Sequence, residues 1–99
     1  MDFEIGKNAE DNWRIIKESS GDDLWFHLNS FPSPHVILKN DVDVTEYILE
    51  CAKLCKLNSK YKNIRNIKIV YTRVDNLEFG DKVGSVNFIS KRKCNYVIP

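Results

Sequence analysis

A chain of 99 residues with 42% apolar and 11% aromatic residues can bury one modest core but has no room for a second, so residues 1–99 are expected to form a single domain. A charged fraction of 29% excludes a mainly disordered chain. No apolar run approaches the roughly 18 residues that a membrane span needs, and the start is acidic rather than basic and apolar. We therefore expect a cytoplasmic protein with no membrane partner.

The net charge of +1 hides a strong asymmetry between the two halves of the chain. Residues 1–50 carry four basic and eleven acidic side chains, a net of −7, whereas residues 51–99 carry eleven basic and three acidic ones, a net of +8. The halves could neutralise each other across the folded surface. Alternatively, the second half could form a basic face that attracts phosphates.

The first elements along the chain are a short strand and a helix. Residues 3–5 alternate between apolar and polar side chains, which predicts a strand. Asn8 fits the N-cap of a helix that ends at residues 19–21 and carries an apolar stripe including Trp13 and Ile16.

Two strands around a proline turn carry both histidines. Residues 24–28 are rich in aromatic side chains, and period-two alternation places Trp25 and His27 on one side of this strand. The prolines in residues 32–34 predict a turn, and residues 35–39 predict the second strand. One face of the second strand holds His35, Ile37 and Lys39.

The clearest helix of the chain follows, over residues 43–59. Its apolar residues recur at helical spacing, and Asp43 or Thr45 opens it. Three strands follow, over residues 67–73, 83–89 and 95–98. The order of these elements predicts an α+β fold, in which a mostly antiparallel sheet carries both helices on one face.

Signals of catalysis and metal binding are weak. Asp22 and Asp23 are adjacent at a strand entry, so their side chains diverge, and a boundary role is favoured over a hydrolytic pair. The three cysteines are expected to be reduced and buried, and two histidines supply too few ligands for zinc. We expect no enzyme activity, metal, cofactor or small-molecule substrate, although a small hydrolase with His27 or His35 as general base stays open.

The histidines themselves allow two interpretations. A single imidazole in a strand is usually buried and hydrogen-bonded. Alternatively, Trp25, His27 and His35 share the sheet face away from the core, where their rings stack on bases while Lys39 or Arg73 meets phosphates. Periodicity alone does not decide between them.

A series of short motifs occurs in a specific order along nearly the whole chain. They are Ile5-Gly6-Lys7-Asn8, Asn12, Asp22-Asp23-Leu24-Trp25-Phe26-His27, His35-Val36-Ile37-Leu38-Lys39, Cys51-Ala52-Lys53-Leu54, Asn58-Ser59-Lys60, Val70-Tyr71-Thr72, Gly84-Ser85-Val86 and Val97-Ile98-Pro99. In this order the motifs closely resemble the RNA-binding module called NFACT-R. One departure is that Ser33 and Pro34 precede His35, where family members often have a glycine and a small residue. Proline stiffens that turn.

The resemblance implies RNA binding. Members of the family occur as the C-terminal module of long proteins in ribosome-associated quality control, which bind the large ribosomal subunit and tRNA and help to elongate C-terminal tails on stalled chains. Others are short stand-alone proteins. Because no coiled-coil arm or second module is evident here, we expect a stand-alone member or a module of a longer protein, and the tailing activity is not carried over.

The expected ligand is therefore tRNA or ribosomal RNA, with the large ribosomal subunit as a partner. The alternative is a protein-interaction module that docks on a ribosomal or quality-control partner through its acidic half. Part of the basic cluster after residue 55 needs no ligand, because a helix C-terminus favours cations. The predicted nucleic-acid-binding residues are Lys7, Asn8, Asn12, Trp25, His27, His35, Lys39, Lys56, Lys60, Arg65, Arg73, Lys91, Arg92 and Lys93.

Overall fold

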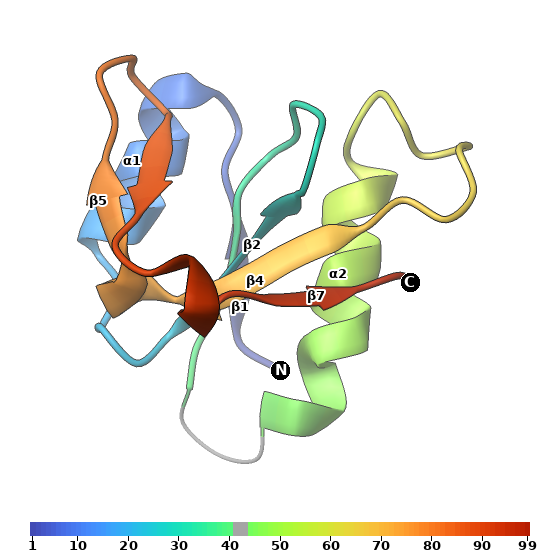
Figure 1. The fold of residues 1–99 in the computed structure, drawn as a ribbon, viewed down its shortest axis with the longest axis horizontal. Coiled ribbons are helices and arrows are strands. Elements are labelled where there is room, and N and C mark those ends of the chain that lie inside the picture. The colour runs from blue at the N-terminus through green and yellow to red at the C-terminus, as the bar shows by residue number, and fades with distance from the viewer. Residues whose placement is uncertain (41–43) are drawn as a thin grey trace.

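A five-stranded antiparallel sheet lies between two helices (Figure 1). The computed structural model describes residues 1–40 and 44–99. The order of strands in the sheet is β1-β3-β2-β4-β7. These strands are β1 (Phe3–Ile5), β2 (Leu24–Leu28), β3 (Val36–Leu38), β4 (Ile69–Arg73) and β7 (Asn95–Val97). A separate hairpin pairs β5 (Leu77–Phe79) with β6 (Val86–Phe88).

The helices are α1 (Ala9–Lys17) and α2 (Ile48–Leu57), and short 3-10 turns cover Val44–Tyr47, Val74–Asn76 and Lys91–Lys93. The predicted N-cap of α1 is confirmed, because the Asn8 side chain accepts a hydrogen bond from the Asp11 backbone N–H at 2.8 Å. Asp43, one predicted start of the second helix, lies outside the described residues. In the part of the chain that the structure describes, neither helix has the length and apolarity to cross a membrane.

Alternation along β2 sends its side chains into two separate cores. Phe26 and Leu28 pack with Cys51 and Cys55 of α2. Trp25 points to the opposite side, where the second core contains Ile15, Ile16, Ile37 and Val70 and thus the buried face of α1. Because apolar side chains leave both faces of the central strands, each face needs its own cover to be removed from water.

The predicted α+β class is therefore confirmed, whereas the expectation that both helices lie on one face is wrong. Of the seven strands within residues 1–40 and 44–99, six lie within or overlap the predicted ones, and β5 was missed. β5 (Leu77–Phe79) shows the same apolar–polar–apolar alternation as residues 3–5, so its signal was present in the sequence.

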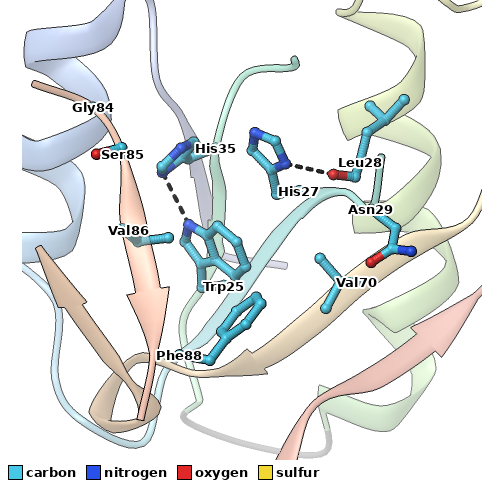
Figure 2. Close-up of a pocket in the computed structure, with 10 residues that line it drawn as sticks. All are labelled: Trp25, His27, Leu28, Asn29, His35, Val70, Gly84, Ser85, Val86 and Phe88. Atoms are coloured by element: carbon cyan, nitrogen blue, oxygen red, sulfur yellow. Dashed lines mark hydrogen bonds between the residues drawn. The ribbon is translucent and has the colours of Figure 1, made fainter. Parts of the chain in front are cut away.

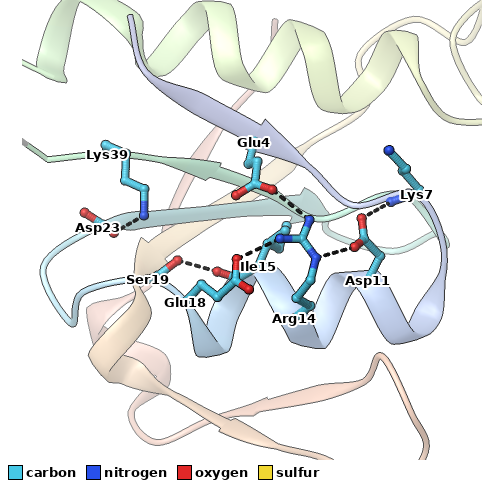
Figure 3. Close-up of polar contacts among 9 residues, drawn as sticks. All are labelled: Glu4, Lys7, Asp11, Arg14, Ile15, Glu18, Ser19, Asp23 and Lys39. Atoms are coloured by element: carbon cyan, nitrogen blue, oxygen red, sulfur yellow. Dashed lines mark hydrogen bonds and ion pairs between the residues drawn. The ribbon is translucent and has the colours of Figure 1, made fainter.

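Arg14 ties α1 to the edge of the sheet (Figure 3). Its guanidinium contacts Glu4 of β1 at 2.7 Å, Asp11 at 2.6 Å and Glu18 at 2.7 Å. The hydrogen bond from Arg14, followed by one from the Lys7 backbone N–H, holds the pKa of Asp11 below its ordinary value. Exposed ion pairs contribute little stability individually. Their effect here is to orient the first turn of α1, which carries Asn12.

Candidate nucleic-acid interface

A groove lies on the α1 side of the sheet, beside the β5–β6 hairpin. One part of it, with a volume of about 270 Å³, is lined by Trp25, His27, Leu28, Asn29, His35, Val70, Gly84, Ser85, Val86 and Phe88 (Figure 2). An adjoining hollow of about 580 Å³ is lined by Gly6, Lys7, Asn8, Ala9, Asn12, His27, Pro32, Ser33, Pro34, His35, Lys82, Val83, Gly84 and Ser85. The two parts share both histidines and the Gly84–Ser85 turn, and we call them together the histidine groove.

The histidine groove unites six of the residues predicted from the sequence. They are Lys7, Asn8, Asn12, Trp25, His27 and His35. Sequence reasoning missed Lys82 and did not include Gly84 and Ser85 among the site residues. The Gly84-Ser85-Val86 motif was a signal for these two residues. The sequence pattern could not show, however, that the hairpin folds back against the histidines.

The rings in the groove are more buried than the binding-face interpretation requires. Trp25 is only 2% exposed and His35 only 3%, whereas His27 is half-buried. The expectation that these rings share an open sheet face is therefore wrong for Trp25 and His35. The reason is that α1 and the β5–β6 hairpin cover this face, with Ile16 and Phe88 packed in the same core as Trp25. The predicted position of Trp25 and His27 on one side of β2 is confirmed, since their rings stack with centroids 5.6 Å apart.

Hydrogen bonds fix both imidazoles. The Trp25 indole N–H donates to His35 Nδ1 at 2.9 Å, and His27 Nδ1 lies 2.6 Å from the Leu28 carbonyl oxygen (Figure 2). The two imidazoles contact each other edge to face, with centroids 5.1 Å apart. The rings thus form a rigid set at one wall of the groove.

Burial keeps these imidazoles uncharged at neutral pH. It lowers the pKa of His35 to about 3, with a smaller contribution from His27. Burial also lowers the pKa of His27, against a weaker opposite effect of its hydrogen bond to Leu28. The positive charge of the groove therefore comes from Lys7 and Lys82, and none of the described residues that line it is acidic.

The motif residues Gly6 and Asn12 hold the backbone of His35. The Gly6 N–H donates to the His35 carbonyl at 2.9 Å, and the His35 N–H donates to Asn12 Oδ1 at 3.2 Å. A Cβ atom at position 6 would overlap Asn12 Oδ1. Glycine is therefore required for β1, α1 and the start of β3 to meet at this point.

A close contact with α1 sets the position of the hairpin wall. Gly84 has a φ of +89°, and a Cβ atom there would lie 2.9 Å from the Cα of Ala9. The Trp13 indole N–H donates to the Ser85 carbonyl at 2.8 Å, and the Trp13 ring packs on Phe79 with centroids 5.0 Å apart. These contacts hold the Gly84–Ser85 turn beside the start of α1.

The proline turn that departs from the family pattern is anchored to both β2 and α2. The Leu28 N–H donates to Ser33 Oγ at 3.1 Å, and the Cys55 thiol donates to the Pro34 carbonyl at 3.4 Å. Ser33 and Pro34 therefore form a fixed edge of the histidine groove rather than a freely moving one.

The remaining predicted basic residues lie outside the groove. Lys39 pairs with Asp23 at 3.3 Å and Arg73 with Asp75 at 2.7 Å, so carboxylates already balance both charges. Lys56 lies in the last turn of α2, with Lys60 and Arg65 in the segment that follows. The turn Lys91–Lys93 lies near the C-terminal end of β4, where the Thr72 hydroxyl donates to the Lys93 carbonyl at 3.0 Å.

The cysteines form no disulfide. Cys51 and Cys55 are buried as predicted, whereas Cys94 is only half-buried, and all three are free thiols. Burial raises the pKa of Cys51 and Cys55 to about 11, so both stay protonated at neutral pH. Among the described residues, no three side chains of His, Cys, Asp or Glu gather where they could hold a metal ion.

The fold and the groove define a small α+β domain with a basic groove beside two fixed imidazoles. Residues 4–90 match the family described as the NFACT protein RNA binding domain, and the chain belongs to this family. It is 35% identical over 102 residues to coiled-coil domain-containing protein 25 of Danio rerio, with 94% of this chain and 49% of that protein covered. It is 27% identical over 90 residues to the Rqc2 homolog RqcH of Bacillus subtilis (strain 168), with 88% and 16% covered.

A solved structure shows the same fold. The C-terminal of the fibronectin/fibrinogen-binding protein from Streptococcus suis (FBPS) superposes with a TM-score of 0.82 at 23% identity, covering 98% of this chain and 41% of that one. The chain spans about half the length, or less, of the curated relatives described here.

Proposed function

We propose that this chain is a non-enzymatic RNA-binding domain that acts in the cytoplasm in ribosome-associated quality control. Its ligand is tRNA or ribosomal RNA, with the large ribosomal subunit as its site of action. The observation that carries the proposal is the histidine groove, because it gathers residues from five separate sequence motifs of a chain that belongs to an RNA-binding family into one cavity.

The charges at the groove support a polyanionic ligand. Lys7 and Lys82 both line it, Lys7 from the segment before α1 and Lys82 from the tip of the hairpin. The first residue of α1, Ala9, also lines it, and the N-terminal end of a helix favours anions. Asp11 is paired with Arg14 and is not among the lining residues. Phosphates can therefore approach without meeting a carboxylate.

The proposal is tested by the affinity for unfractionated tRNA at several salt concentrations. We expect affinity to fall steeply with salt, since lysine–phosphate contacts release counterions. The double variant Lys7→Ala/Lys82→Ala should bind roughly tenfold more weakly, and the slope of log affinity against log salt should become shallower by about 2.

A matched variant separates the groove from the other basic surface. Lys53→Ala/Lys62→Ala removes the same charge from exposed positions in α2 and the loop after it, and it should bind nearly as well as the unmodified chain. If only this control pair weakens binding, tRNA contacts the α2 end rather than the groove. Affinity that does not change with salt would contradict RNA binding through phosphates altogether.

The alternative of an acidic docking surface receives less support from the structure. Glu4, Asp11 and Glu18 all share the Arg14 guanidinium, and Asp23 is buried against Lys39. Four of the eleven acidic side chains in the first half thus already contact a cation of that half, which leaves them less available to a partner. A ribosome association that survives complete nuclease digestion would favour protein docking.

A further inference from the structure

The hydrogen bond from Trp25 determines which nitrogen of His35 carries the proton. An indole N–H can only donate, so His35 Nδ1 must accept. A neutral imidazole with an accepting Nδ1 holds its single proton on Nε2. His35 is only 3% exposed and lines both parts of the groove. Among the described residues, none accepts a hydrogen bond from its Nε2. His35 therefore offers the groove an unused N–H donor.

His27 has the opposite arrangement. The Leu28 carbonyl can only accept, so His27 Nδ1 must donate to it. The remaining nitrogen, Nε2, then carries a lone pair, and no residue in the described part of the chain donates a hydrogen bond to it. His27 therefore offers the groove an acceptor.

The His35 donor and the His27 acceptor belong to neighbouring rings. The ring centroids are 5.1 Å apart, and Figure 2 shows both imidazoles next to each other at one wall, with Trp25 and Phe88 beneath them. A neighbouring donor and acceptor complement a flat, neutral group that presents an acceptor next to a donor. A phosphate has no donor at neutral pH and would meet the His27 lone pair, so it fits the lysines better than the rings.

We propose that the histidine groove takes one unpaired nucleobase of a bound RNA, which accepts a hydrogen bond from His35 Nε2 and donates one to His27 Nε2. This inference rests on the proposed function. The edge that does so is the Watson–Crick edge, where each of the four bases places an acceptor beside a donor. Bases in a duplex already use this edge, so the nucleotide must be unpaired. Lys7 and Lys82, in the adjoining hollow, hold the flanking phosphates.

A peptide amide also presents an acceptor and a donor. The nucleobase is favoured because the ring pair is continuous with a hollow that contains two lysines and no acidic residue among its described lining. Such a hollow suits a chain with a charge at every repeat, which RNA has and a neutral peptide lacks.

The first test compares three single-stranded probes of nine nucleotides at one salt concentration. They are oligouridylate, the same oligomer with N3-methyluridine, and an abasic ribose-phosphate oligomer. Methylation removes the base donor and leaves the phosphate charge unchanged. We expect oligouridylate to bind about tenfold or more tightly than either control, with the same salt slope for all three.

The possible failures differ. Equal affinity of the three probes, with tRNA binding intact, would overturn the base pocket alone. A chain that binds neither tRNA nor oligouridylate would overturn the proposed function itself. Displacement of bound oligouridylate by N-acetylglycinamide but not by uridine would show that the groove takes a peptide amide.

A second test needs no ligand. Nitrogen-15 NMR of the imidazoles should show the proton on Nδ1 of His27 and on Nε2 of His35, and the reverse tautomer in either ring would overturn the proposal. The variant His27→Phe keeps a ring but removes the acceptor. It should weaken oligouridylate binding about tenfold and leave the N3-methyluridine oligomer unaffected, and an equal loss for both probes would contradict base recognition by His27.

Discussion

Gly6 and Asn12 act on the groove through hydrogen bonds with the backbone of His35. Both belong to motifs that the sequence singles out, and the predicted roles placed Asn12 directly at the ligand. The structure adds that Asn12 Oδ1 already accepts the His35 N–H. This could not be read from the sequence, since it depends on three elements meeting at one point.

Gly6→Ala should therefore disturb the site and the fold together. The new methyl group would overlap Asn12 Oδ1, which costs about 1–3 kcal/mol of unfolding free energy, as overpacking of a well-packed site does. We also expect tRNA affinity to fall, because His35 loses its support. Denaturant unfolding and tRNA titration measure the two effects.

Gly21→Ala is the matched control. A Cβ atom there would approach only the Asp75 side chain, at 3.2 Å, at an exposed site. Its unfolding free energy should lie within about 0.5 kcal/mol of the unmodified chain. If both variants unfold alike, the Gly6–Asn12 contact has no special role.

Among the secondary-structure elements, the β5–β6 hairpin is the part of the groove that could least be predicted from the sequence. Alternation correctly assigned Trp25 and His27 to one side of β2, because side-chain direction in a strand is a local property. It could not reveal that a hairpin formed some 60 residues later would cover that side, since the cover is a long-range contact. For the same reason, the helices were placed on one face instead of two.

Trp13→Phe should loosen this hairpin without unfolding the sheet. Phenylalanine can still pack on Phe79 but lacks the N–H that reaches the Ser85 carbonyl. The loss of one hydrogen bond costs about 1 kcal/mol. We expect faster amide hydrogen exchange over residues 82–88 and weaker oligouridylate binding, while exchange in β2 and β4 stays slow. Uniformly faster exchange throughout the chain would show that the hairpin is not a separate wall.

For the molecule as a whole, the charge asymmetry seen in the sequence persists in the folded chain. Each ion pair found in the described part of the chain joins residues of the same half. Among residues 1–40 and 44–99, the acidic charge of the first half is therefore not neutralised by ion pairs with the second half. The sequence left this open, because the partners of a charge depend on packing and not on composition.

The stability of the whole domain should depend on pH through Asp23. Its carboxylate accepts from the backbone N–H groups of Ser20 and Asn40 and from Lys39 (Figure 3 shows the Lys39 contact), which confirms its predicted boundary role. Burial alone would raise the pKa of Asp23, but these hydrogen bonds together hold it below the ordinary value. A carboxyl group with a lowered folded-state pKa stabilises the fold above its unfolded pKa, near 3.9, and this contribution is lost as pH falls through the folded value.

Asp23→Asn should thus lower the unfolding free energy at pH 7 and flatten its decline below about pH 4. Asp22→Asn, at the exposed neighbouring position, should keep the steeper decline of the unmodified chain. Denaturant titrations from pH 7 to pH 2.5 compare the three proteins. Parallel curves for all three would show that Asp23 is not a source of acid sensitivity.

The fixed imidazoles also have an entropic consequence. A ligand that must order loose side chains loses part of its interaction free energy to that ordering. Here a hydrogen bond from Trp25 holds His35, and the Leu28 carbonyl and the stacked Trp25 ring hold His27. The rotamers of both imidazoles are therefore already fixed in the folded chain. In the proposed complex, the two imidazoles then add no ordering cost of their own at the base, and only the ligand and the exposed Lys7 and Lys82 side chains have to be immobilised. A contact area limited to one base and its two phosphates can therefore still give a measurable affinity.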